Sequence, residues 1–159
     1  MTNNEVKTKT RLAVEITQIA GVAAIPDTDC EYTVEAGSLI SAAEYLLGAG
    51  YEFLADITAV DYLAEGNFRL LYQIANYHNG DIITLKLDIP RENAVADSLF
   101  GVFAAANWLE REVYDMFGIK FAGHPDLRRI LMWDGYEGWP LRKDFVQEVS
   151  KYQGRRRLD

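Results

Sequence analysis

Acidic side chains cluster in one short segment, residues 107–117, and paired carboxylates are what general acid–base chemistry requires. Glu110, Glu112 and Asp115 lie within a span of six residues. The alternative interpretation is a solvated helix face on which Arg111 and Asp115, four residues apart, form a weak ion pair. From the residues alone we favour this alternative, because charged helix faces are common in soluble proteins.

Metal-binding and nucleophilic chemistry have little support in the sequence. His78 and His124 are the only histidines, and neither lies in a helical metal-ligand pattern. Cys30 is the only cysteine, which excludes a disulfide framework, a cysteine zinc site and a cysteine-ligated iron–sulfur cluster built from this chain alone. Glycine-rich phosphate-binding motifs and a nucleophile elbow are also missing. We therefore expect no cofactor in this chain.

The charge of the chain changes along its length. Sixteen basic and 24 acidic residues give a net charge of −8, which disfavours binding to nucleic acid. Residues 1–100 hold six basic and fifteen acidic residues, whereas the segment from Lys120 onward holds nine basic and six acidic. The start of the chain lacks the pattern of a signal peptide, and no apolar run approaches the roughly 20 residues of a membrane helix. We expect a soluble or peripheral protein without a transmembrane segment.

Residues 4–118 are predicted to form one α+β domain, an antiparallel β-meander with helices packed on one face. Apolar residues at helical spacing predict helices over residues 4–20, 39–48 and 107–117, with Ser38 capping the second and Ser98 capping a further short helical segment. Alternating or β-rich segments predict strands over residues 31–36, 51–61, 68–77 and 82–89. Asn79-Gly80 is a strong signal for the hairpin between the last two strands, and Pro90 ends the second of them.

Beyond Gly118 the periodicity stops, and Gly or Pro recurs every few residues. An irregular segment of this length is far longer than the usual loop of about 4–6 residues, yet its aromatic and aliphatic content argues against disorder. Such a segment needs a surface to lie on, either this domain or a partner. We expect residues 119–159 to form an extended, irregular, partner-binding C-terminal tail.

Three separated motifs then occur in order. Residues 107–121 read NWLEREVYDMFGIKF, followed by GHPDLRRIL at 123–131 and PLRKDF at 140–145, and an upstream strand reads DITAVDY at 56–62. Together these strongly resemble the 30-kilodalton subunit family of the respiratory NADH:quinone oxidoreductase (complex I), also known as its C subunit. Members of this family commonly have Pro after RKDF, where this chain has Val146.

The resemblance implies a non-redox structural subunit in the peripheral arm of a proton-pumping complex, on the cytoplasmic side of the cell membrane. Such a subunit supports electron transfer from NADH to quinone, while FMN and iron–sulfur clusters are carried by other subunits. The implied partners are the quinone-site subunit and the cluster-bearing subunit next to it. Two alternatives stay open: the equivalent subunit of a membrane-bound hydrogenase, formate hydrogenlyase or ferredoxin- or F420-linked complex, and a stand-alone adaptor.

We expect the partner interface to use the charged and aromatic residues of these motifs. They are Glu110, Arg111, Glu112, Asp115, Phe117, His124, Asp126, Arg128, Arg129, Trp133, Trp139, Arg142, Lys143 and Asp144. Among them, the basic residues are expected to include buried ion-pair partners for carboxylates on neighbouring subunits or on the helix that carries Glu110 and Asp115.

Overall fold

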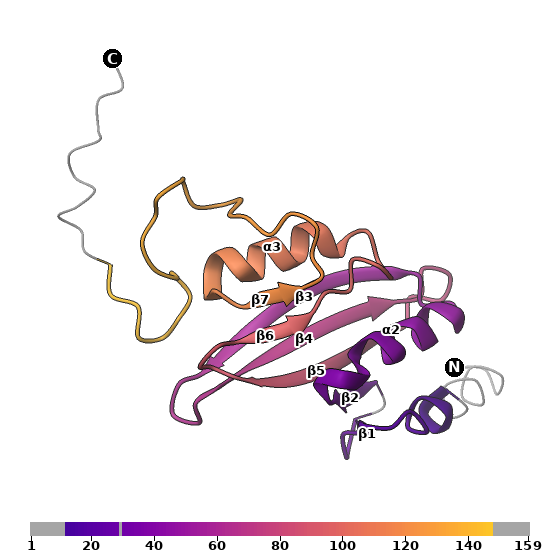
Figure 1. The fold of residues 1–159 in the computed structure, drawn as a ribbon. Helices are drawn as coiled ribbons and strands as arrows, with labels where there is room; N and C mark the ends of the chain where they lie inside the picture. The colour runs from indigo at the N-terminus through magenta and orange to yellow at the C-terminus, as the bar shows by residue number, and fades with distance from the viewer. Residues whose placement is uncertain (1–11, 29, 148–159) are drawn as a thin grey trace.

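A computed structural model describes residues 12–28 and 30–147 of the chain (Figure 1). The fold is α+β, as expected: a five-stranded sheet carries helices on one face, and a long irregular tail follows the last helix. Residues 12–16 are helical, within the segment expected to form the first helix. The rest of that expectation, over residues 4–11, and the basic run Arg155-Arg156-Arg157 lie outside the described residues.

The predicted meander is present. It consists of β3 (Phe53–Tyr62), β4 (Asn67–Ala75) and β5 (Ile82–Pro90), paired antiparallel in sequence order. The hairpin between β4 and β5 is longer than a two-residue turn. Gly80 has the expected positive φ of 74°, while the side-chain oxygen of Asn76 accepts hydrogen bonds from the backbone N–H groups of His78 and Asn79.

The sheet also has a parallel pair that the sequence did not predict. β2 (Glu31–Val34) pairs parallel with β5 and antiparallel with β1 (Val22–Ala24), so the strand order is β1-β2-β5-β4-β3. β1 and β2 contain three and four residues, too few to show a period. Pairing between β2 and β5 also joins segments about fifty residues apart, which no local pattern can indicate.

The second helix forms where it was predicted, but without the predicted side-chain cap. A 3-10 turn, η1 (Ala36–Ser38), leads into α2 (Leu39–Gly48), whose buried stripe faces the sheet. Ser38 occupies the N-cap position, yet its Oγ donates to the carbonyl oxygen of Ala20 rather than serving the first turn of α2. The hydroxyl thus joins the end of the preceding segment to the start of the helix.

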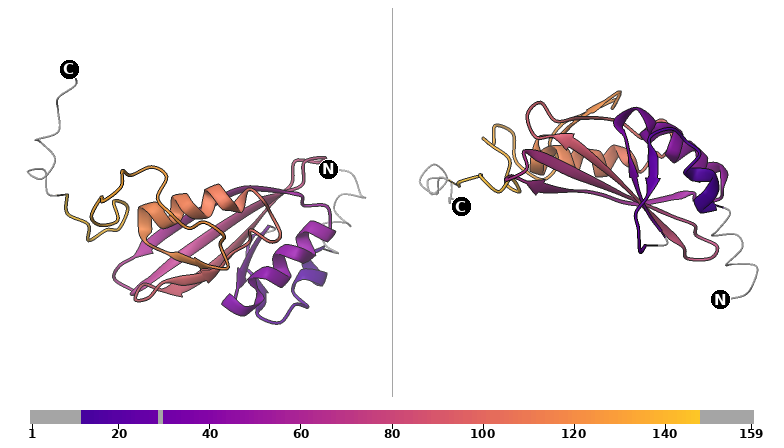
Figure 2. Two further views of the ribbon diagram at one scale, coloured as in Figure 1. Left: turned by 45° about the horizontal axis from the view of Figure 1, so that its top comes forward. Right: turned by 90° about the horizontal axis from the view of Figure 1, so that it is seen from below.

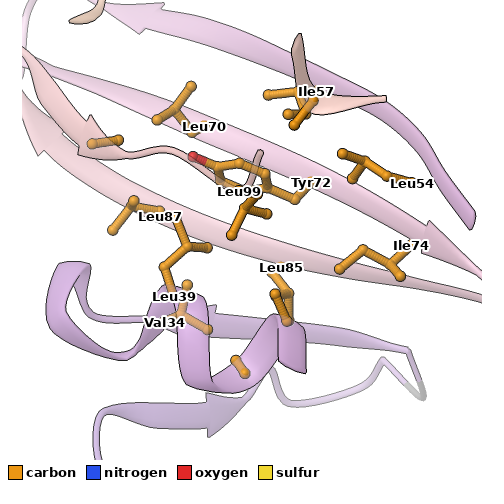
Figure 3. Packing of buried hydrophobic residues seen from close by; sticks show 14 of the residues in the cluster. Val34, Leu39, Leu54, Ile57, Leu70, Tyr72, Ile74, Leu85, Leu87 and Leu99 are labelled. Atoms are coloured by element: carbon orange, nitrogen blue, oxygen red, sulfur yellow. The ribbon is translucent and has the colours of Figure 1, made fainter. Parts of the chain in front are cut away.

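The core lies between the helices and one face of the sheet. Alternate residues of β4 and β5 point to this face, and Figure 3 shows Leu85 and Leu87 of β5 close to Leu39 of α2 and Val34 of β2. Each fully buried side chain of this size contributes roughly 1.5–3 kcal/mol by leaving water. The opposite face of the sheet carries more exposed side chains, including the Arg69–Asp88 ion pair.

A second, two-stranded sheet lies beside the third helix. α3 (Ala106–Phe117) is followed by β7 (Lys120–Ala122), which pairs parallel with β6 (Val95–Asp97). The segment after Ser98 forms turns rather than a short helix, although Ser98 Oγ does accept from the N–H of Phe100. Because β7 is a strand and Phe121 is buried in the core, residues 119–122 belong to the folded domain, and the irregular tail begins after Ala122.

Candidate partner-binding surface

The described part of the tail lies along α3 and follows it from its N-terminal to its C-terminal end (Figures 1 and 2). Near the start of the helix, Nε2 of His124 is 3.1 Å from the carbonyl oxygen of Asn107. One turn later, Nε of Arg111 donates to the carbonyl oxygen of Arg128 at 3.2 Å. For residues 123–147, therefore, the chain's own domain supplies the surface that the sequence left undecided between domain and partner.

Asp115 is the first of two buried carboxylates that hold the tail. Its Oδ2 accepts hydrogen bonds from three consecutive backbone N–H groups, those of residues 130–132, at 2.6 to 2.9 Å. Burial raises the pKa of this carboxyl, but the N–H groups of Met132 and Leu131, the Arg129 guanidinium and the N–H of Ile130 lower it further, so the pKa lies below its ordinary value. The side chain is fully buried, so the expected solvated helix face is wrong at this position.

Arg129 completes this anchor from the tail. Its Nη1 donates to Asp115 Oδ1 at 2.7 Å and to the Asp115 carbonyl at 3.0 Å, while Nη2 donates to the carbonyl of Gly138 at 2.8 Å. The guanidinium also lies over the Trp139 ring at 4.3 Å. Of the two partners expected for this arginine, the carboxylate on the chain's own helix is confirmed. The ion pair that was expected between Asp115 and Arg111 is replaced by this one.

Asp61 is the second anchoring carboxylate, and a β-bulge in β3 turns it inward. The register of β3 against β4 shifts between Leu54 and Asp56, so the extra residue reverses the alternation of side chains. Beyond the bulge, Ile57, Ala59 and Asp61 face the core, whereas regular alternation from Leu54 would have pointed them to the open face.

The buried Asp61 side chain joins the loop after β5 to the end of the tail. It accepts from Nε and Nη2 of Arg91 at 3.0 and 3.3 Å, and its Oδ2 accepts from the backbone N–H of Lys143 at 2.9 Å. Arg91 bonds Asp144 as well, and this contact lowers the pKa of the exposed Asp144 carboxyl. The side chain of Lys143 is itself exposed, so only its backbone takes part.

Between the two anchors, the tail closes over the C-terminal end of α3. The backbone N–H of Leu141 donates to the carbonyl of Met116 at 3.1 Å, and Nε of Arg142 donates to the carbonyl of Phe117 at 2.6 Å. These bonds satisfy carbonyl groups that a helix end leaves without partners. The ring of Phe117 is buried and packs edge-on against Phe68 at a centroid distance of 6.0 Å.

Glu110 stabilises the segment that leads into α3. It is fully buried, accepts from Ser98 Oγ at 2.6 Å and accepts from the N–H of Leu99 at 2.7 Å. Burial raises the pKa of this carboxyl to about 7, although both hydrogen bonds oppose the shift. Arg111 beside it is also buried and lies over the Trp108 ring at 5.0 Å. The solvated-face interpretation is therefore wrong for these two residues as well.

The GHPDLRRIL segment begins with a turn built by His124. Nδ1 of this histidine accepts from the backbone N–H of Asp126 at 3.0 Å, which leaves Nε2 to donate to the carbonyl of Asn107. Asp126 and Arg128 form an ion pair at 2.8 Å, but their side chains are 52% and 71% exposed. The expected buried pair is therefore wrong for Arg128, and a pair this exposed contributes little stability.

The expected interface residues thus divide into two groups. Eight of them point into the domain or between domain and tail: Glu110, Arg111, Asp115, Phe117, His124, Arg129, Trp139 and Arg142. Six have exposed side chains: Glu112, Asp126, Arg128, Trp133, Lys143 and Asp144.

Large apolar side chains are also exposed on α3 and the tail. They are Trp108, Leu131, Trp133, Leu141 and Val146, and we call them the outer apolar residues. Trp108 is 64% exposed and Val146 is 81% exposed. Exposed aromatic residues next to arginine are typical of protein–protein interfaces.

Sequence reasoning missed Asp61 and Arg91 as parts of this arrangement. Asp61 lies in the DITAVDY motif, which was a usable signal, but its inward direction depends on a bulge that the strand pattern does not reveal. Arg91 follows a strand that ends at Pro90, so it resembles an ordinary loop residue.

Comparison with known proteins identifies the class to which this fold and this tail belong. Residues 32–151 match the family described as "Respiratory-chain NADH dehydrogenase, 30 Kd subunit", and the chain belongs to that family. Proteins named as the C subunit of NADH-quinone oxidoreductase are similar to it over much of their length. The one from Geobacter metallireducens is 42% identical over 129 residues, covering 77% of this chain and 80% of the relative. The one from Moorella thermoacetica is 38% identical over 128 residues, covering 76% and 86%.

Two solved structures are also similar. A trypsin-resistant fragment of Nqo5 is 27% identical, with a TM-score of 0.63 over 75% of this chain and 99% of the fragment. A chain from the membrane-bound sulfane sulfur reductase, described as an archaeal respiratory membrane complex, has a TM-score of 0.79 over 99% of this chain and 94% of its own. At 23% identity, this second likeness concerns the fold alone.

Over residues 12–28 and 30–147, no helix is both long and apolar enough to cross a bilayer. The same residues contain no group of three or more His, Cys, Asp or Glu side chains placed to hold a metal ion.

Proposed function

We propose that this chain is a non-redox structural subunit in the peripheral arm of a proton-pumping NADH:quinone oxidoreductase. It supports the transfer of electrons from NADH to quinone without carrying them. The family to which it belongs and the names of its relatives support this assignment.

The observation that carries the structural role is how the charged motif residues are used. Glu110 and Asp115 are fully buried, and each is bonded to backbone or side-chain donors of this same chain. Groups that are desolvated and fully bonded hold a structure together but are not accessible to a substrate. The single cysteine of the sequence also falls short of the thiolate ligands that iron–sulfur clusters use. FMN and the iron–sulfur clusters accordingly belong to other subunits.

The partners of this proposal are the quinone-site subunit and the cluster-bearing subunit next to it, on the cytoplasmic side of the membrane. The outer apolar residues support an extended contact along α3 and the tail, because large apolar groups left in water gain free energy when a partner covers them. The anchoring of the tail by Asp115 and Asp61 holds these residues in place before any partner binds, which reduces the entropy lost on assembly.

Copurification tests the assignment. The affinity-tagged chain is isolated from detergent-solubilised membranes of its own host, and the material is assayed for FMN, iron and NADH-dependent reduction of a soluble quinone. We expect all three in the purified complex, and neither flavin nor iron in the separated chain. Copurification with hydrogenase or ferredoxin-linked subunits in place of an NADH-oxidising flavoprotein would overturn the proposal, as would isolation of the chain with no other subunit.

Depletion of the chain tests the structural role separately. Membranes without it should lose NADH:quinone activity while retaining NADH oxidation by ferricyanide, because the flavin-bearing subunits do not require it for their own chemistry. Equal retention of both activities would contradict a structural role.

A further inference from the structure

A groove of about 780 Å³ lies at the junction of the domain and the tail. The loop after β5 forms one part of it, and the facing residues Val95 of β6 and Lys120 of β7 form another. Trp139 and Arg142 of the tail close the remaining side. The groove exists only because the tail lies on this domain, so it is a product of the two anchors.

The charge of this groove is opposite to that of the chain as a whole. Three cationic side chains, from Arg91, Lys120 and Arg142, line it with a single acidic one, Glu92, although the chain carries a net charge of −8. Arg91 is already neutralised by Asp61 and Asp144. Within the described parts of the chain, no carboxylate lies at ion-pair distance from Lys120 or Arg142.

Arg142 is held rigidly with its charge only partly compensated. Its Nε is bonded to the Phe117 carbonyl, and its guanidinium lies over the Phe68 ring at 5.2 Å, which fixes the plane of the group. Burial, together with the neighbouring positive charge of Arg91, lowers the pKa of this guanidinium. A carboxylate that bonded the Nη atoms would supply the missing charge, and a planar guanidinium suits a carboxylate well.

We propose that this groove, named here the cationic groove after Arg91, Lys120 and Arg142, receives an acidic segment of another polypeptide of the same complex. A carboxylate of that segment bonds Arg142 and Lys120, and the chain beside it covers the exposed side chain of Val95. This inference rests on the proposed function, because it takes the chain to be one component of a larger complex.

Two other occupants fit less well. The last twelve residues of this chain, 148–159, hold four basic and two acidic residues, so like charge disfavours their entry. A free anion such as phosphate would satisfy the cations but would leave Leu63 and Val95 at the rim in water, since both are exposed. A polypeptide can meet the charged and the apolar parts at once.

Photo-crosslinking in the assembled complex tests the proposal. A benzoylphenylalanine residue is placed at Val95 in the tagged chain, and a matched control carries it at Ile82, an exposed residue at the opposite end of β5. After irradiation of the purified complex, we expect a crosslink from position 95 to one segment of another subunit, and this segment contains Asp or Glu. The control at position 82 should not reach the same segment.

Charge reversal then tests the chemistry. Lys120→Glu should lower the yield of this crosslink by about tenfold, the effect of roughly 1.4 kcal/mol in binding, because it opposes the incoming carboxylate. Arg128→Glu reverses an exposed cation outside the groove and should leave the yield unchanged. Changing the crosslinked carboxylate to Lys in the Lys120→Glu background should restore it.

Several outcomes would overturn the inference: no crosslink from position 95 in an intact complex, a crosslinked segment without carboxylates, or a yield that Lys120→Glu does not change. Saturable binding of inorganic phosphate to the free chain, lost in Lys120→Glu and without a peptide crosslink, would assign the groove to a small anion instead. All these results are obtained on a complex that has formed. They are therefore distinct from failure of the proposed function, in which no complex copurifies with the tagged chain.

Discussion

A β-carbon placed on Gly118 would lie 2.5 Å from the indole ring of Trp139, closer than any real contact allows. Gly118 also ends α3 in the left-handed region, with φ at 75°, so its lack of a side chain is required twice. The close approach lets the tail cover the end of the helix, where Arg142 reaches the Phe117 carbonyl.

Gly118→Ala should therefore destabilise the chain and loosen the tail. The left-handed conformation alone costs an alanine about 1–2 kcal/mol, and displacement of Trp139 adds to this. Urea unfolding followed by tryptophan fluorescence measures the change. Gly101→Ala is the matched control, because nothing lies within 4 Å of a β-carbon there. In a Trp139→Ala background the added cost of Gly118→Ala should shrink toward the backbone strain alone, and an undiminished cost would show that the ring contact is unimportant.

Replacing Asp115 should be far more harmful than replacing an exposed acid of the tail. Asp115→Asn leaves the Arg129 guanidinium without its carboxylate in a site from which water is largely excluded, which typically costs about 3–5 kcal/mol. For a chain of this size we expect a fall in Tm of roughly 10 °C by calorimetry. Asp126→Asn removes one side of the exposed Arg128 pair and should cost under about 1 kcal/mol. Similar losses from the two variants would refute the buried anchor.

The raised pKa of Glu110 predicts a specific dependence of stability on pH. Its pKa is 4.5 in the reference state and about 7 in the folded chain, so between these values the folded state binds more protons than the unfolded state. The contribution of this group to stability is therefore fully present below about pH 4.5, falls as pH rises toward 7 and stays low above it. At 1.36 kcal/mol per pKa unit, the change amounts to roughly 3 kcal/mol.

Glu110→Gln should remove this slope, because the amide keeps an acceptor for the Leu99 N–H and does not ionise. Urea unfolding at pH values from 4.5 to 8 measures it, with Glu112→Gln, an exposed change on the same helix, as the control. The opposite sign applies to Asp115, whose lowered pKa makes its contribution disappear as pH falls through that value. A Glu110→Gln chain with the wild-type slope would show that another group is responsible.

The two carboxylate anchors should protect different parts of the tail from trypsin. In the free wild-type chain, Arg129 and Arg142 are held by bonds to Asp115 and Phe117, so we expect slow cleavage after both. Asp115→Asn should speed cleavage near Arg129, and Asp61→Asn should speed cleavage near Arg142 and Lys143. Mass spectrometry of timed digests identifies the sites.

Asp88→Asn provides the control, since Asp88 pairs with Arg69 on the open face of the sheet, away from the tail. Rapid wild-type cleavage throughout residues 128–143, unaffected by either anchor variant, would mean that the tail is not fastened to the domain in solution.

The sequence by itself determined the features that depend on local pattern. The alternation of β5 predicted which residues face the core, and Gly48 and Gly118 marked the ends of α2 and α3. These signals work because a strand or helix repeats its geometry every few residues, so burial on one side appears as a period. The motifs from residue 107 to 145 also sufficed to indicate the family, which the match over residues 32–151 confirms.

Only the tertiary structure decided how the charged residues are used. Glu110, Arg111 and Asp115 have the composition of a solvated helix face, yet the tail and the segment before α3 cover them and supply their partners. Asp61 faces inward because one extra residue in β3 reverses the alternation. Both outcomes depend on contacts between segments far apart in the chain, and the free energy of burying a charge is set by those partners rather than by its neighbours in sequence.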